Sequence, residues 1–158
     1  MIKDQLIENT LLVLKDELDN AISAAQQAHD GATHEQSKAE TQYDTLGLEH
    51  AYLAQGQSRR IDELVHSISL LENWKVIDFA NDDEIYLGAM VTLKGVLNNK
   101  HLTVLLAPAG GGVVIRLDEK EYQMITPQTP LGQALIGLTI DESLSLANGL
   151  KYQIIGIC

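Results

Sequence analysis

Carboxylate and imidazole side chains, the types that could hold a metal ion, gather in residues 29–44, HDGATHEQSKAETQYD. They are Asp30, Glu35, Glu40 and Asp44 with His29 and His34. Carboxylate oxygens suit hard divalent cations, and imidazole is a common metal ligand. The two histidines are five residues apart, which is not a standard spacing for a metal site. On spacing alone, a solvated acidic helix end is the simpler interpretation, because the helix dipole favours acid in a first turn.

Two long helices are expected to position this acidic stretch. In the first, apolar residues recur at alternating spacings of four and three, the seam of a coiled coil: Ile7, Leu11, Leu14, Leu18, Ala21, Ala25, Ala28 and Ala32. A second seam is formed by Ile61, Leu64, Ile68 and Leu71. The second helix is expected to start between Thr33 and Ser37, since either hydroxyl fits a capping box. The sequence therefore predicts an antiparallel hairpin with its turn at or next to residues 29–43.

The period changes after Trp74, where short runs rich in Val, Ile, Leu and Tyr alternate with Gly, Asn, Asp or Pro. Seven strands are predicted, at residues 76–79, 89–96, 102–107, 113–117, 122–125, 143–146 and 152–157. Hairpin turns are predicted at residues 98–99, 109–112 and 148–149. The fold class is therefore α+β, with a coiled-coil hairpin over residues 1–73 and a small, mostly antiparallel β domain over residues 74–158.

One short helix is expected inside the β domain, in TPLGQALIG, residues 129–137. Thr129 can cap it, Pro130 suits its first position and Gly137 suits its exit. The side chains expected to pack on the sheet are Leu131, Leu135 and Ile136.

Composition narrows the choice of partners. The 158 residues are 45% hydrophobic, which is enough for a packed core, and the net charge is −11. Residues 1–72 carry 13 Asp and Glu against 5 Lys and Arg. This excess argues against binding nucleic acid mainly through phosphates and favours a basic partner surface. No secretory signal or membrane-spanning run is present, and Cys158 is a single cysteine. A cytoplasmic protein that binds no membrane is expected.

Five motifs, taken in order, carry a resemblance to a known family. They are RRIDEL (residues 59–64), WKVID (74–78), YLGAMVTL (86–93), ITPQTPLGQALIG (125–137) and YQIIGI (152–157). In order and spacing they resemble the GreA/GreB transcript cleavage factor family. Residues 39–57, AETQYDTLGLEHAYLAQGQ, resemble the stretch that carries the family's acidic motif. The resemblance implies that the β domain behind the coiled coil is FKBP-like.

The resemblance implies a transcription elongation factor, not an enzyme, that binds bacterial RNA polymerase at the rim of the secondary channel. The residues implied for polymerase binding are Pro130, Leu131, Gly132 and Gln133. The coiled coil would enter the channel, where tip carboxylates help hold the second Mg²⁺ of the polymerase and the water that hydrolyses the 3′ end of backtracked RNA. These carboxylates are Glu40, Glu35 and Asp30. The chain would hold no cofactor or permanent metal of its own, as a monomer or weak homodimer.

The acidic stretch departs from the family pattern at two positions. Family cleavage factors have two acidic residues three positions apart at the start of the second helix, the later one followed by Asn. Here Glu40 matches the later one, but Thr41 follows it and Ser37 precedes it by three. Two activities stay open: cleavage stimulation with Glu35 as the substitute, and a non-cleaving channel binder that competes with true cleavage factors. From other classes, an isomerase-like protein acting on peptidyl-prolyl bonds and a dimerising coiled-coil adaptor stay open.

Overall fold

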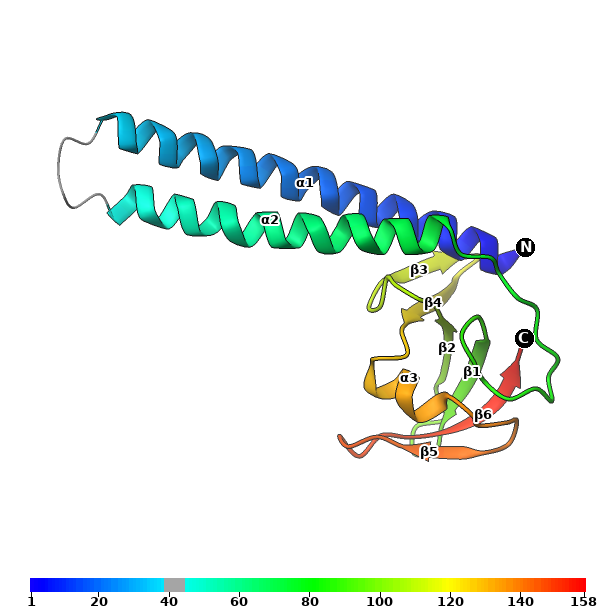
Figure 1. The fold of residues 1–158 in the computed structure, drawn as a ribbon. Helices are drawn as coiled ribbons and strands as arrows, with labels where there is room; N and C mark the ends of the chain where they lie inside the picture. The colour runs from blue at the N-terminus through cyan, green and yellow to red at the C-terminus, as the bar shows by residue number, and fades with distance from the viewer. Residues whose placement is uncertain (39–44) are drawn as a thin grey trace. The chain divides into compact units, whose positions relative to one another are not determined.

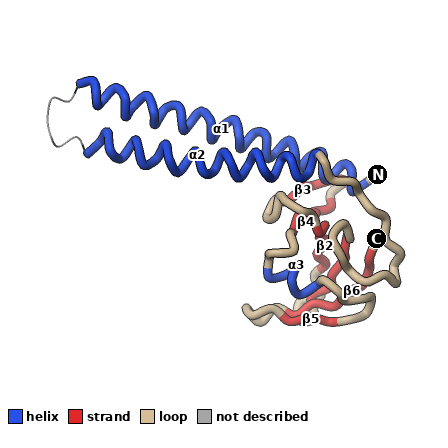
Figure 2. The backbone as a smooth tube through the Cα atoms, viewed as in Figure 1, coloured by secondary structure: helices blue, strands red, loops and turns tan. Residues whose placement is uncertain are grey.

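Two long helices precede a small sheet. In the computed structural model, the backbone is described for residues 1–38 and 45–158, and the side chains for residues 1–27 and 56–158. The helices α1 (Ile2–Lys38) and α2 (Thr45–Glu72) lie side by side and run in opposite directions (Figure 1). The described chain after α2 forms strands, loops and one short helix (Figure 2). The α+β prediction of a helical hairpin followed by a mostly antiparallel sheet is confirmed.

The second helix begins later than the sequence predicts. The prediction that the second helix starts between Thr33 and Ser37 is wrong, because α1 continues through both residues to Lys38 and α2 begins at Thr45. Alanine has the highest helix propensity, and alanines are frequent between Ala21 and Ala32. The single Gly31 costs only about 1 kcal/mol in a helix interior. One glycine and two hydroxyl residues therefore do not end this helix.

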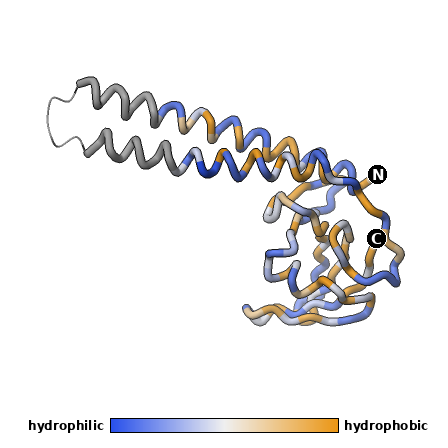
Figure 3. Tube along the Cα trace, viewed as in Figure 1, coloured by the Kyte–Doolittle hydropathy of each residue, from blue (hydrophilic) through white to orange (hydrophobic). Residues whose placement is uncertain are grey.

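The predicted seam is buried or half-buried wherever its side chains are described; Leu11, Leu18, Ala25 and Ile61 are half-buried. Its buried members are Ile7, Leu14, Ala21, Leu64, Ile68 and Leu71. Hydrophobic and hydrophilic residues alternate along the described parts of both helices (Figure 3), as in helices with one apolar face. Across the pair, Arg60 Nη2 lies 2.8 Å from Glu17 Oε2. About half of each side chain is exposed to solvent, so this ion pair contributes at most about 1 kcal/mol.

The chain divides into two compact units, each described here by itself. One unit is Val13–Ile68. The other combines Met1–Leu12 with Ser69–Cys158 and therefore contains the first turns of α1 as well as the whole sheet. Among the helical residues that the structure describes, no helix is long and apolar enough to cross a membrane.

Six strands form one sheet in the order β3-β4-β2-β1-β6-β5. Their bounds are β1 (Met90–Gly95), β2 (His101–Leu106), β3 (Val114–Leu117), β4 (Lys120–Ile125), β5 (Ser143–Ser145) and β6 (Lys151–Ile157). Every pairing is antiparallel except that of β2 with β4. The predicted strand at residues 76–79 is wrong, because this segment forms no strand. The carbonyl of Ile77 instead accepts a hydrogen bond from Lys3 on α1.

Two of the three predicted hairpin turns are confirmed, those joining β1 to β2 and β5 to β6. The prediction for residues 109–112 is wrong, because that turn leads from β2 to β3, which are not neighbours in the sheet. Gly110 is required there for a different reason. Its φ is +82°, and a Cβ would lie 2.8 Å from Thr10 Cγ2 on α1. The glycine therefore permits close approach of the loop to the helix.

Lys3, in the first turn of α1, contacts the segment that follows α2. Only 7% of the residue is exposed. Its Nζ donates a hydrogen bond to Ile77 O at 2.7 Å and lies 5.1 Å from the centroid of the Phe79 ring. Burial lowers the pKa of Lys3, while the charges of Cys158 and Asp78 act in the opposite direction. The charged form is therefore less stable here than in the unfolded chain.

Replacing Lys3 with methionine is expected to remove a pH dependence of stability. Between the lowered pKa of the folded state and the ordinary value of about 10.4, the unfolded chain binds more protons at this residue. The free energy of unfolding of the wild type should therefore rise with pH in that interval, relative to Lys3→Met. Urea unfolding at several pH values below 10.4 measures the difference between the two proteins. Parallel curves for the two proteins would contradict the expectation.

Candidate functional site

The acidic tip is only partly described. Asp30 and Glu35 belong to α1, near its C-terminal end, and their side chains lie outside the described residues, as does the whole of Glu40. Five residues along an α-helix turn the backbone by about 140° from a shared face. The Cα atoms of Asp30 and Glu35 therefore do not lie on one face of α1. Glu35 also belongs to the first helix, whereas both acidic positions of the family motif belong to the second.

The second predicted site, around Pro130, is described in full. Its helix is α3 (Pro130–Leu135), which has proline in its first turn. Thr129 Oγ1 accepts a hydrogen bond from Gly132 N at 3.1 Å and donates one to Thr126 O at 2.7 Å. The prediction that Thr129 caps this helix is confirmed. Because the backbone N of Thr129 also donates to Thr126 O, at 3.1 Å, the turn before α3 is closed by two hydrogen bonds on one carbonyl.

The four residues implied for polymerase binding differ in exposure. Pro130 and Gln133 are exposed, Leu131 is half-buried and Gly132 is buried. Leu131 packs against the core of the sheet, so the surface at this end of α3 is formed by Pro130 and Gln133. The prediction that Ile136 packs on the sheet is wrong, since it is 38% exposed. Its backbone N–H instead donates to Gly132 O at the end of the helix.

Loss of the Thr129 cap is expected to cost about 1 kcal/mol of stability. Thr129→Val keeps the shape of the side chain but removes the hydroxyl that satisfies Gly132 N. Urea unfolding followed by the fluorescence of Trp74 measures the change. Ser145→Ala, at an exposed position on β5, is the matched loss of a hydroxyl and should change stability by less than about 0.5 kcal/mol. Equal losses for the two variants would contradict the role given to Thr129.

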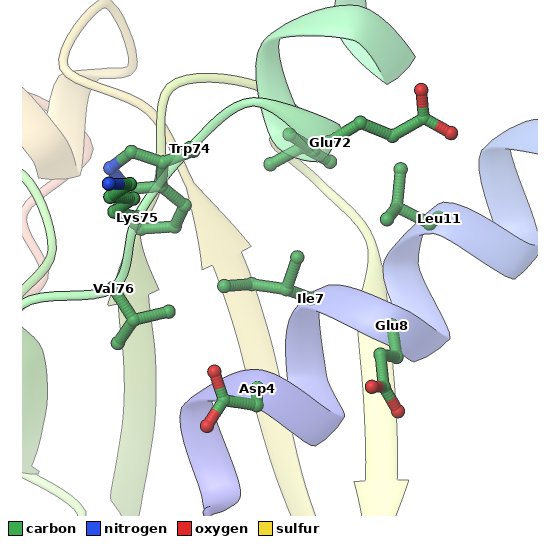
Figure 4. A pocket seen from close by; sticks show the side chains of 9 residues that line it. Asp4, Ile7, Glu8, Leu11, Glu72, Trp74, Lys75 and Val76 are labelled. Carbon is green, nitrogen blue, oxygen red and sulfur yellow. The ribbon is translucent and has the colours of Figure 1, made fainter.

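A groove that the sequence did not predict lies between the start of α1 and the segment after α2. Its cavity is about 440 Å³. Figure 4 shows the apolar side chains of Ile7, Leu11 and Val76 in this pocket together with the carboxylates of Asp4 and Glu8. Leu71, Glu72, Trp74 and Lys75 complete its walls. No local pattern predicted the groove, because its walls come from segments about 65 residues apart. The sequence signal that could have indicated the groove is the acidic pair Asp4 and Glu8, beside the apolar seam of the first helix.

The described residues offer no metal centre. Among them, no group of three or more His, Cys, Asp and Glu side chains is placed to hold an ion. The groove of Figure 4 combines apolar side chains with the carboxylates of Asp4 and Glu8 and with Lys75. Cys158 is exposed as a free thiol.

Comparison with known proteins gives matches to solved structures alone. No protein-family model matches the chain, and no curated protein matches it. GreA factor homolog 1 (Gfh1) of Thermus thermophilus is 22% identical, covering 94% of this chain and 94% of its own, with a TM-score of 0.40. Gfh1 of Thermus aquaticus is 22% identical, covering 91% and 90%, also at 0.40. Another structure of the transcription factor Gfh1 is 24% identical, covering 93% and 92%, at 0.41.

Proposed function

We propose that this chain is a transcription elongation factor of the Gre type that binds bacterial RNA polymerase and places its helical hairpin in the secondary channel. The observation that carries the proposal is the series of five motifs between residues 59 and 157. RRIDEL lies in α2, YLGAMVTL leads into β1 and YQIIGI lies in β6, while WKVID lies in the segment after α2 that forms no helix or strand. ITPQTPLGQALIG spans the end of β4, the capped turn and α3. The polymerase-binding surface is proposed to be Pro130 and Gln133, supported from beneath by Leu131 and Gly132.

The helical pair has the length and charge that the proposal needs. The 37 residues of α1 extend over about 55 Å at about 1.5 Å per residue. Residues 1–72 carry 13 acidic against 5 basic side chains. A long acidic hairpin suits a passage with basic walls, and carboxylates near the turn could add oxygen ligands to a Mg²⁺ that the polymerase holds.

A second candidate, a channel binder that does not promote cleavage, is favoured by the tip. Ser37 stands where the family has its first carboxylate, and the substitute Glu35 belongs to α1. Glu40 is then the single carboxylate that matches the motif. One ligand fewer for a weakly held Mg²⁺ weakens its binding, so competition with true cleavage factors becomes the expected activity.

The experiment uses backtracked complexes of purified bacterial RNA polymerase with labelled RNA and Mg²⁺. If the chain stimulates cleavage, it shortens the transcript, and Glu40→Ala or the Glu35→Ala, Glu40→Ala pair abolishes the shortening. If it does not, it slows the shortening that an added Gre factor produces. Asp62→Ala removes an exposed carboxylate of α2 as a control and should have neither effect. A chain that neither shortens RNA nor slows the added factor would overturn the proposal.

A further inference from the structure

Two neighbouring turns of the sheet expose apolar side chains. β1 and β6 are paired, and Val96 N donates a hydrogen bond to Lys151 O at 3.0 Å, so the β1–β2 turn lies beside the β5–β6 turn. Leu97 is 84% exposed, Val96 52% and Leu150 43%. Three lysines flank these residues. The turn surface, as named here, consists of Val96, Leu97, Leu150, Lys94, Lys100 and Lys151.

Hydrogen bonds hold both turns in defined shapes. Asn98 Oδ1 accepts from Lys100 N at 2.9 Å, and Asn148 Oδ1 accepts from Leu150 N at 3.0 Å. A Cβ on Gly95 would lie 2.1 Å from Asn98 Oδ1, so the first turn closes tightly over a glycine. The exposed leucines are therefore carried on ordered backbone, and a partner would bind them without first ordering the turns.

The turn surface is positive in a protein that is strongly negative. The chain has a net charge of −11, yet residues 85–117 and 143–158 contain no Asp or Glu. Lys100 and Lys151 are exposed, and Lys94, on β1, is half-buried. On the side of β4, the turn from β3 to β4 carries Asp118 and Glu119, which limits the positive area in that direction.

We propose that the turn surface binds an acidic segment of a partner protein that also carries apolar side chains. Leu97 and Leu150 would lose contact with water against those side chains, and the lysines would meet the carboxylates. Neither the motif around Pro130 nor the acidic hairpin is used in this contact. The proposal is therefore independent of binding to RNA polymerase.

The net charge favours a short acidic segment over an extended polyanion. A nucleic acid or an anionic bilayer extends beyond the three lysines of the turn surface. It is therefore repelled by the rest of the protein, whose net charge is −11. A peptide segment contacts the turn surface alone, and at physiological salt charges more than about 8 Å away are largely screened from it. The attraction between the lysines and the carboxylates of the peptide then exceeds the repulsion between the peptide and the net negative charge of the protein.

The test measures binding of the full chain to a fluorescently labelled peptide of alternating glutamate and leucine. Leu97→Asn and the Lys100→Glu, Lys151→Glu pair should each weaken binding by on the order of tenfold or more. The controls are Leu12→Asn, at a leucine that is 66% exposed on α1, and Arg59→Glu, at an exposed cation on α2. Both should bind the peptide like the wild type, and unfolding curves check that every variant is folded.

Parallel arms use vesicles containing phosphatidylserine, single-stranded DNA, and sedimentation of the chain alone. Peptide binding that depends on the turn surface, with weaker or absent binding in these arms, supports the proposal. Absent peptide binding, or binding that the turn variants leave unchanged, overturns it. The proposal is also overturned if the chain binds vesicles, DNA or a second copy of itself more strongly than the peptide, and the turn variants lose that binding. The turn surface would then be assigned to that other partner.

Discussion

Gly132→Ala is expected to lower the free energy of unfolding by about 3 kcal/mol or more, through overpacking and damage to a buried hydrogen-bonded turn. A Cβ at this position would lie 2.0 Å from Thr126 O and 2.9 Å from Thr129 Oγ1. The first of these atoms is backbone and cannot turn away as the end of a side chain does. The carbonyl would have to move, and it accepts both hydrogen bonds that close the turn before α3.

Urea unfolding followed by Trp74 fluorescence measures this loss. Gln133→Ala is the matched control, because the residue is adjacent and exposed, and alanine favours a helix. Its stability should stay within about 0.5 kcal/mol of the wild type. A Gly132→Ala protein as stable as this control would show that the turn can shift cheaply, contrary to the geometry described above.

Pro130→Asp is expected to weaken binding to bacterial RNA polymerase by more than about tenfold, if α3 forms the proposed contact. The change places a charged, hydrated carboxylate in the centre of that surface. The fold should tolerate it, because Pro130 is exposed and acid in the first turn of a helix is favoured by the dipole. Binding of immobilised polymerase to the wild type and the variant measures the loss.

Val114→Asp is the control for Pro130→Asp. It introduces the same carboxylate at a residue that is 52% exposed on the edge strand β3, outside the proposed surface of Pro130 and Gln133. It should bind the polymerase like the wild type. Equal weakening by both variants would point to a general effect of added negative charge, and no weakening by Pro130→Asp would remove α3 from the interface.

The predictions from sequence were most accurate for features that depend on a few neighbouring residues, such as helix caps and hairpin turns. Thr129 with Pro130 defined a helix start, and the asparagines at positions 98, 99 and 148 marked the turns of two hairpins. Each of these signals acts within a few residues, so tertiary packing had little opportunity to override it. The seam of the hairpin was equally readable, because burial at Leu14 and Leu64 follows directly from helical periodicity.

The wrong predictions arise where a local sequence pattern competes with another interaction of similar strength. Thr33 and Ser37 can cap a helix, but in an alanine-rich segment they are also tolerated inside one, and α1 continues through them. Residues 76–79 have the composition of a strand, yet the carbonyl of Ile77 is taken by Lys3, which is 74 residues away in sequence. Local patterns contain no information about such a distant partner, and the groove of Figure 4 was missed for the same reason.

The central claim is that this chain binds RNA polymerase at the site used by Gre factors, and an equilibrium competition tests it most directly. The chain, labelled at Cys158, is titrated with purified bacterial RNA polymerase, and an unlabelled Gre cleavage factor is then added. Saturable binding that the cleavage factor displaces completely is the predicted result. Absence of saturable binding, or binding that persists at saturating cleavage factor, would contradict the claim.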